Sequence, residues 1–173
     1  MLQNPKTKKG LSLIEVVLYS AILIIAMSLL IYTFERISVS YGRVKSSKAI
    51  EESATYAIDR MAREINSGTS IDVAASTLGS TPGRLFLYTI DENNASSTSE
   101  FYLSGQTLHI KVAGVDQGPL NVSGARVTSL IFRSIDTTQT KGIKIEMVIE
   151  SATGTSYLSK NFYDTMVLRG TNK

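Results

Sequence analysis

The sequence offers few side chains whose types and spacing could do chemistry. It contains one histidine, His109, and no cysteine, so a Ser-His-Asp hydrolase site could be built only around His109, and a zinc site held by cysteines is excluded. No phosphate-binding loop or dinucleotide-binding pattern occurs. His109 lies between Leu108 and Ile110 in a run of strand-forming residues, where a histidine is far more often a strand residue than a catalytic base. We expect no enzyme, no catalytic residue and no cofactor, and we keep a membrane-bound hydrolase centred on His109 as an alternative.

Two other groups of polar residues are weaker signals. The run Asp91-Glu92-Asn93-Asn94 is rich in side-chain oxygen, but it lacks the alternating ligand positions of a calcium loop, and a hairpin turn explains it better. Basic residues on predicted strands could present one face to DNA, although they alternate with acidic residues as on a solvated sheet surface. These residues are Arg126, Arg133, Lys141 and Lys144. We expect neither a metal site nor a nucleic-acid partner.

The excess positive charge lies at one end of the chain. The formal net charge is +3 over 173 residues, and Lys6, Lys8 and Lys9 lie in the first ten residues without an acidic residue. The rest of the chain carries 15 basic and 15 acidic side chains. The basicity therefore belongs to this leader and not to a binding surface. The absence of cysteine also excludes a disulfide scaffold and a lipoprotein anchor.

A long apolar run follows the leader from Leu11 to Phe34, and its only charged side chain is Glu15. As a helix it would measure about 36 Å, enough to cross a hydrocarbon core of about 30 Å. A secretory signal peptide has a shorter apolar region and a small-x-small cleavage site, for which only Ser38-Val39-Ser40 is available. The lysines before the run predict a cytoplasmic N-terminus and an exported remainder.

Glu15 needs an explanation that a plain membrane anchor does not give. A carboxylate at the bilayer centre costs about 2.5 to 3.5 kcal/mol, and Glu15 lies near the cytoplasmic edge, where the cost is smaller. Ionisable residues inside membrane spans are functional candidates, usually with a partner of opposite charge. The expected partner of Glu15 is a cation from another chain.

The segment Lys8-Lys9-Gly10-Leu11-Ser12-Leu13-Ile14-Glu15-Val16-Val17, leading into a long apolar helix, resembles the prepilin processing site of type IV pilins and type II secretion pseudopilins. The resemblance covers about 30 residues. It implies that a prepilin peptidase cuts between Gly10 and Leu11 and methylates the new amino terminus of Leu11. It also implies an assembly role for Glu15, which in this family accepts the N-terminal amine of a neighbouring subunit in the filament.

Two departures from the family pattern bear on the type of subunit. The first residue after the expected cut is Leu11, where most members have phenylalanine, and the apolar run has no proline near its middle. The second departure favours a minor pilin or minor pseudopilin. The resemblance further implies sister subunits, the peptidase and methyltransferase, and an inner-membrane assembly platform as partners. The chain would be stored in the cytoplasmic membrane and would become part of an extracellular or periplasmic filament.

The pattern after the membrane run predicts that the helix continues through residues 35–68. Apolar residues recur at steps of three and four on one face, namely Ile50, Ala54, Ala57, Ile58, Met61 and Ile65. Asp59 and Arg63 on the other face are spaced for an i,i+4 ion pair. Ser67 and Gly68 should end the helix, and Gly42 should weaken it or bend it.

From residue 69 the period changes to two, which predicts a β-rich head over residues 69–173. Expected strands are 84–90, 100–103, 107–112, 126–134, 142–150 and parts of 157–168, with exposed loops at 75–83 and 91–99. Expected core aromatics are Phe86, Phe101, Phe132 and Phe162. The second half of the helix should complete this core, which gives an α+β, pilin-like fold of one long N-terminal helix packed on an antiparallel sheet.

The domain order predicted from the sequence is therefore a cleaved leader at 1–10, a membrane and filament-core helix at 11–34, an amphipathic helix at 35–68 and the head at 69–173. The predicted function is that of a filament subunit processed by prepilin peptidase. The alternative is a single-pass adhesin or receptor that is anchored in the membrane and does not assemble.

Overall fold

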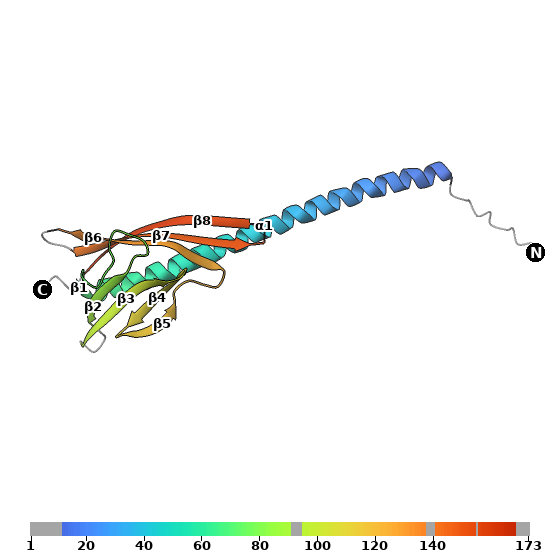
Figure 1. The fold of residues 1–173 in the computed structure, drawn as a ribbon. Helices are drawn as coiled ribbons and strands as arrows, with labels where there is room; N and C mark the ends of the chain where they lie inside the picture. Colours follow the sequence, from blue (N-terminus) through green and yellow to red (C-terminus); the bar gives the residue numbers. More distant parts are fainter. Residues whose placement is uncertain (1–11, 91–94, 138–140, 155, 169–173) are drawn as a thin grey trace, which may run out of the picture. The chain divides into compact units, whose positions relative to one another are not determined.

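The computed structural model describes residues 12–90, 95–137, 141–154 and 156–168. The chain separates into two compact units, residues 1–40 and residues 41–173. Helix α1, Leu13–Ser67, begins in the first unit and ends in the second (Figure 1). Gly42 lies within α1, so the helix continues through this position as predicted. The helix ends at Ser67, which was also predicted.

In the second unit, α1 contributes one buried stripe to the core of the head. Its buried apolar members are Ile50, Ala54, Ala57, Met61 and Ile65, and Ile58 is partly buried. The predicted stripe is thus confirmed. The predicted ion pair between Asp59 and Arg63 is replaced by one between Arg60 and Glu64, with Nη2 and Oε1 2.8 Å apart.

A five-stranded antiparallel sheet follows the helix, in the order β1-β2-β3-β4-β5. Its strands are β1 (Gly68–Ile71), β2 (Leu85–Ile90), β3 (Ser96–Ser104), β4 (Thr107–Val112) and β5 (Val115–Pro119). Neighbours in the sequence pair throughout, so each connection is a local turn or loop. Glycines in the left-handed region, Gly105 and Gly114, supply two of the tight turns.

A second antiparallel sheet has three long strands, β6 (Ala125–Asp136), β7 (Lys141–Thr153) and β8 (Ser156–Val167), in that order. In β7 the residues Ile143, Ile145, Met147 and Ile149 are buried and alternate with half-buried residues. Figure 1 shows this sheet, in orange and red, and the five-stranded sheet, in green and yellow, both lying against the second half of α1. The fold is therefore α+β, with a long apolar N-terminal helix packed on antiparallel sheet.

The structure corrects the predicted head in three respects. The strands form two sheets, where the pattern predicted one sheet. Strands β1 and β5 were not predicted, and residues 96–99 of the expected loop 91–99 belong to β3. Residues 91–94 of that loop lie outside the described residues. Among the four aromatic residues expected in the core, Phe101 and Phe132 are fully buried, whereas Phe86 and Phe162 are partly buried.

Small polar residues fix α1 to the head. Ser46 and Ser53 have no exposed surface. Ser46 Oγ donates to Thr153 Oγ1 at 3.0 Å, and Ser53 Oγ accepts from the backbone N–H of Val122 at 3.0 Å. These bonds satisfy polar groups that would otherwise be buried without partners. They also place the β7–β8 turn and the segment after β5 against the same helix face.

Candidate functional site

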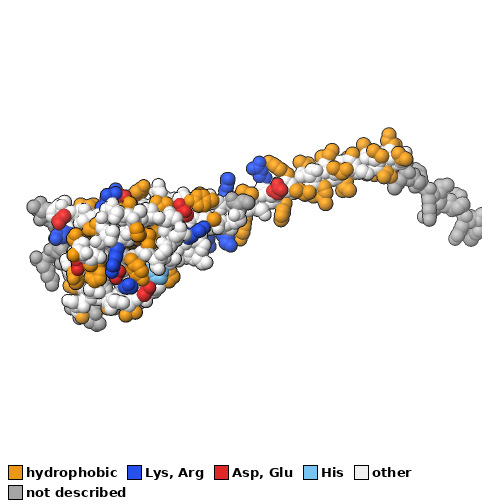
Figure 2. All heavy atoms as spheres, in the orientation of Figure 1, with side chains coloured by type: hydrophobic (Ala, Val, Ile, Leu, Met, Phe, Trp, Pro, Cys, Tyr) orange, Lys and Arg blue, Asp and Glu red, His pale blue; other side chains and the backbone are white. Residues whose placement is uncertain are grey.

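The first unit consists, in its described part, of helix with apolar side chains on every side. Between residues 13 and 34 the large apolar side chains are 49% (Val16) to 83% (Leu13) exposed. Figure 2 shows this surface as an orange covering along the N-terminal part of the helix. A soluble protein would bury such a surface, because a helix that is apolar on all sides is typical of a membrane span or of the interior of a larger assembly. The segment is long and apolar enough to anchor the chain in a membrane.

Glu15 is the one acidic residue in this apolar stretch, and it lies in the first turn of α1. Its carboxylate Oε1 accepts a hydrogen bond from the hydroxyl of Tyr19 at 3.1 Å. Within the described part of the chain, no Lys or Arg side chain forms an ion pair with Glu15. One Tyr hydroxyl does not neutralise a carboxylate, so within the described ranges Glu15 is an acid without a cationic partner at the edge of an apolar surface.

The start of the helix gives Glu15 a second possible role that the sequence prediction missed. Ser12 precedes the first helical residue, and the backbone N–H groups of Glu15 and Val16 donate to Ser12 O at 3.0 and 3.2 Å. Ser12-x-x-Glu15 is the spacing of a capping box, in which the acid supports the helix start. Glutamine serves at this position as well as glutamate. A Glu15→Gln variant therefore separates a helix-start role from a role for the charge.

The processing residues predicted from the sequence, Gly10 and Leu11, lie outside the described residues. Ser12 is the first described residue, and the helix begins one residue later. The oxygen-rich run 91–94, which was weighed as a calcium loop, also lies outside the described residues. Among the residues that the structure describes, no group of three or more His, Asp or Glu side chains is arranged to hold a metal ion.

His109 forms part of a cross-strand polar cluster in the head. It lies on β4 opposite Tyr102 on β3, and its Nδ1 is 3.1 Å from Asp116 Oδ2. Asp116 also accepts from the Tyr102 hydroxyl at 2.9 Å and from the Gly118 N–H at 2.8 Å. The carboxylate thus joins three strands. Within the described residues no serine or threonine hydroxyl bonds to His109, so the geometry supplies a structural contact and no nucleophile.

This cluster shifts two pKa values in opposite directions. The hydrogen bonds from Gly118, Tyr102 and His109 lower the pKa of Asp116 from its usual 3.8. Burial and the neighbouring carboxylate raise the pKa of Tyr102 from its usual 10.0. Because the folded pKa of Asp116 is lowered, its stabilising effect is complete above about pH 4 and is lost as the pH falls through the lower folded value.

Replacing Asp116 with Asn should lower the raised pKa of Tyr102 toward 10.0 without removing the part caused by burial. The measurement is an ultraviolet titration of phenolate absorbance. Subtracting the curve of a matched variant that also carries Tyr102→Phe isolates Tyr102 from the other seven of the 8 tyrosines. An unchanged Tyr102 titration in Asp116→Asn would show that the carboxylate does not act on the phenol.

The basic residues considered for DNA binding lie on β6 and β7 among acidic partners. Arg133 Nε and Lys144 Nζ are 3.1 and 2.9 Å from the same Glu146 Oε1, and they lower the pKa of Glu146. Arg126 lies opposite Glu150, and Lys141 lies opposite Asp136. The alternation of charge predicted from the sequence is therefore confirmed. Each of the four basic residues thus lies beside or opposite an acidic residue on these strands.

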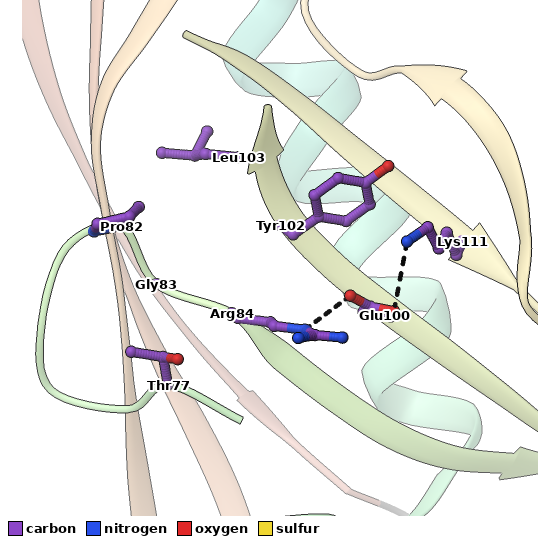
Figure 3. A pocket seen from close by; sticks show the side chains of 8 residues that line it. All are labelled: Thr77, Pro82, Gly83, Arg84, Glu100, Tyr102, Leu103 and Lys111. Atoms are coloured by element: carbon purple, nitrogen blue, oxygen red, sulfur yellow. Dashed lines mark ion pairs between the residues drawn. The ribbon is translucent and has the colours of Figure 1, made fainter. Parts of the chain in front are cut away.

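A hollow of about 320 Å³ beside the five-stranded sheet is lined by three charged residues, Arg84, Glu100 and Lys111. Figure 3 shows Glu100 between two cations, with Arg84 Nε at 2.7 Å and Lys111 Nζ at 3.9 Å. Lys111 Nζ also lies 4.5 Å from the ring centroid of Tyr102. Glu100 is 8% exposed, and a carboxylate buried to this degree requires such compensation. The cluster therefore explains how β2, β3 and β4 tolerate a buried acid.

No protein-family model, curated protein or solved structure matches this chain. Its function must therefore be inferred from its own residues and their geometry. Contacts within the described fold do not account for the exposed apolar surface of α1 between residues 13 and 34, or for Glu15 at its start. The polar clusters of the head, by contrast, are explained by contacts between strands.

Proposed function

We propose that this chain is a structural subunit, of the minor type, of a type IV pilus-like or type II secretion filament. The observation that carries the proposal is the carboxylate of Glu15, which has no cationic partner among the described residues, in the first turn of a helix whose residues 13–34 are apolar on every side. An anchor needs the apolar surface but gains nothing from the charge. A subunit that packs its helix against other subunits can use both.

In the proposed assembly, the apolar surface leaves lipid and packs against equivalent helices. Because lipid and protein interiors are similarly apolar, packing alone gives weak preference for one axial position. Glu15 would supply that preference by accepting the N-terminal amine of a neighbouring subunit. In a low-dielectric bundle a displaced subunit would leave both charges unpaired, which costs several kcal/mol.

The proposed pairing requires a free amine close to the start of α1. Cleavage between Gly10 and Leu11 by a prepilin peptidase would create it, and methylation of Leu11 would retain its positive charge. Gly10 has no side chain to obstruct a peptidase at the scissile bond, and the lysines before it would hold that bond at the cytoplasmic face. The head would then be exported, and the assembly platform of the inner membrane would add the subunit to its sister subunits.

Gly10→Val should abolish this processing in cells that contain a prepilin peptidase, because a branched side chain would obstruct the scissile bond. Intact-mass analysis of the purified membrane protein should show loss of residues 1–10 in the native chain and their retention in the variant. Thr7→Val places the same side chain elsewhere in the leader and should be cleaved normally. A native chain that keeps residues 1–10 in the presence of the peptidase would overturn the proposal.

The competing function is a single-pass adhesin or receptor that keeps its helix in the membrane. It makes the opposite prediction for Glu15, whose replacement should then have no effect on the location or the partners of the chain.

A further inference from the structure

Most sheet edges in the described structure are short or covered. β1 has 4 residues, and β5 has 5 residues and ends in Gly118 and Pro119, which weaken further pairing. The edge of β6 is covered by the loop between β1 and β2, since the N–H groups of Gly79 and Gly83 donate to Phe132 O and Leu130 O, both at 2.8 Å. β8 is different, because its 12 residues pair with β7 on one side and with no described strand on the other.

The hydrogen-bond pattern shows which backbone groups of β8 point outward. The N–H of Leu168 donates to Lys141 O at 2.9 Å, and β7 and β8 keep one register from there to the turn. Bonding residues alternate along an antiparallel pair, so the even-numbered residues of β8 bond to β7 and the odd-numbered ones face away. Thr165 N–H, in the outward set, donates to Asp164 Oδ1 at 2.7 Å. The remaining central members of this set are Tyr157, Ser159, Asn161 and Tyr163.

The side chains of β8 leave this edge open to a partner. The odd-numbered side chains are exposed and uncharged, so they lack the outward lysines with which many proteins protect an edge. On the other face, Lys160 Nζ is already bonded to Glu51 Oε1 at 2.6 Å and to Ser47 Oγ at 3.2 Å. Asp164, in contrast, has no cation within ion-pair distance in the described part of the chain. Leu158 and Phe162 are only partly buried.

We propose that the outer edge of β8 binds an extended segment of another exported protein as an added antiparallel strand. The outward backbone groups of β8 would supply the hydrogen bonds. Specificity would come from the side chains of the bound segment that lie next to the even-numbered residues Leu158, Phe162 and Asp164 of β8. The bound segment would have a basic residue opposite Asp164, an apolar residue opposite Phe162 and a second apolar residue opposite Leu158. Because the segment runs antiparallel to β8, its sequence pattern from the N-terminus is basic-x-apolar-x-x-x-apolar. β8 itself contains this pattern at Lys160, Phe162 and Met166, so its own sequence is a suitable probe.

Pairing with a second copy through this edge would fix the relative direction of the two heads. A Cβ on Gly42 would lie 3.2 Å from Ser156 Oγ, and one on Gly68 would lie 3.5 Å from a methyl carbon of Leu168. β8 therefore runs in the same direction as the part of α1 from Gly42 to its end at Ser67. Two copies joined through antiparallel β8 strands would therefore have these segments of α1 in opposite directions, a constraint that does not apply to a separate extended segment.

The test is the binding of a fluorescent peptide with the sequence of residues 156–168 to the full chain in lipid nanodiscs, followed by fluorescence anisotropy. We expect saturable binding, and a peptide with Lys160→Glu should bind about fivefold more weakly because like charges would then be opposed across the strands. An Asp164→Lys protein should reverse this preference. Absence of saturable binding, equal binding of a scrambled peptide, or an unreversed preference would each overturn the proposal.

A backbone variant tests the edge independently of charge. Asn161→Pro removes an N–H that faces away from β7, so the native ladder is retained, while peptide binding should fall at least about tenfold. Asn161→Thr keeps the N–H and should bind like the native chain. Equal binding by a folded Asn161→Pro chain would overturn the proposal, and if that variant fails to fold, the charge reversal decides. Neither measurement depends on processing or filament formation, so the proposed function can fail or succeed separately.

Discussion

Glu15→Ala should leave the chain in the membrane and reduce its incorporation into filaments by about tenfold or more. The substitution removes the carboxylate that would meet a neighbouring amine, and an amine left unpaired in an apolar bundle costs more than the 1.4 kcal/mol that corresponds to a factor of about ten. Membrane insertion should not suffer, because alanine is easier to place in a bilayer than a carboxylate. The measurement is the ratio of the chain in sheared filaments to the chain in membranes, by immunoblot.

Glu15→Gln is the matched control for this prediction. Glutamine can still accept the hydrogen bond from Tyr19 and can still serve at the third position of the helix start, but it carries no charge. If the charge sets the axial position, Glu15→Gln should fail as Glu15→Ala does. Normal incorporation of the glutamine variant would assign Glu15 to the helix start, and normal incorporation of both variants would favour the anchored adhesin or receptor.

Phe132→Ala should destabilise the head by about 3 to 5 kcal/mol. Phe132 lies on β6 with no exposed surface and pairs across the strands with Ile145. Gly83 packs against its ring, since a Cβ at that position would lie 3.1 Å from Phe132 Cδ2. A cavity there would affect both the three-stranded sheet and the loop that covers its edge. With domain stabilities of about 5 to 15 kcal/mol, the loss is a large part of the total.

Urea unfolding of the full chain in detergent, followed by tyrosine fluorescence because the chain has no tryptophan, measures this effect. Val115→Ala is the control, because Val115 is 62% exposed on β5 and its truncation should change the free energy of unfolding by less than about 0.5 kcal/mol. A loss of less than 1 kcal/mol in Phe132→Ala would show that the described packing around β6 is wrong.

The periodic parts of the fold were predictable because burial repeats along the sequence. Ile50, Ala54, Ala57 and Met61 follow the helical period, and Ile143, Ile145, Met147 and Ile149 follow the strand period. The short strands β1 and β5 were missed, since Gly68 and Gly118-Pro119 are typical of turns and their pairing depends on neighbouring strands. The division into two sheets also depends on contacts between segments distant in the sequence.

The buried serines were missed for a different reason. Ser46 and Ser53 lie on the same helix face as Ile50 and Ala57, at spacings of three and four residues, but serine is normally assigned to solvent. Their partners are Thr153 and the N–H of Val122, which no local pattern reveals. Small residues in line with an apolar stripe are the signal that could have identified them. For the candidate site, sequence identified Glu15, and the structure added Ser12 and Tyr19 beside it.

The absence of a side chain at Gly42 sets how closely the β7–β8 turn approaches α1. A Cβ there would lie 3.1 Å from the carbonyl oxygen of Thr153, closer than ordinary van der Waals contact allows without adjustment. A bulkier residue would push the hairpin tip outward and lengthen the adjacent bond between Ser46 and Thr153. The helix accepts a residue that weakens it, by about 1 kcal/mol relative to alanine. In return, the β7–β8 turn packs directly against the backbone of α1 with no side chain between them.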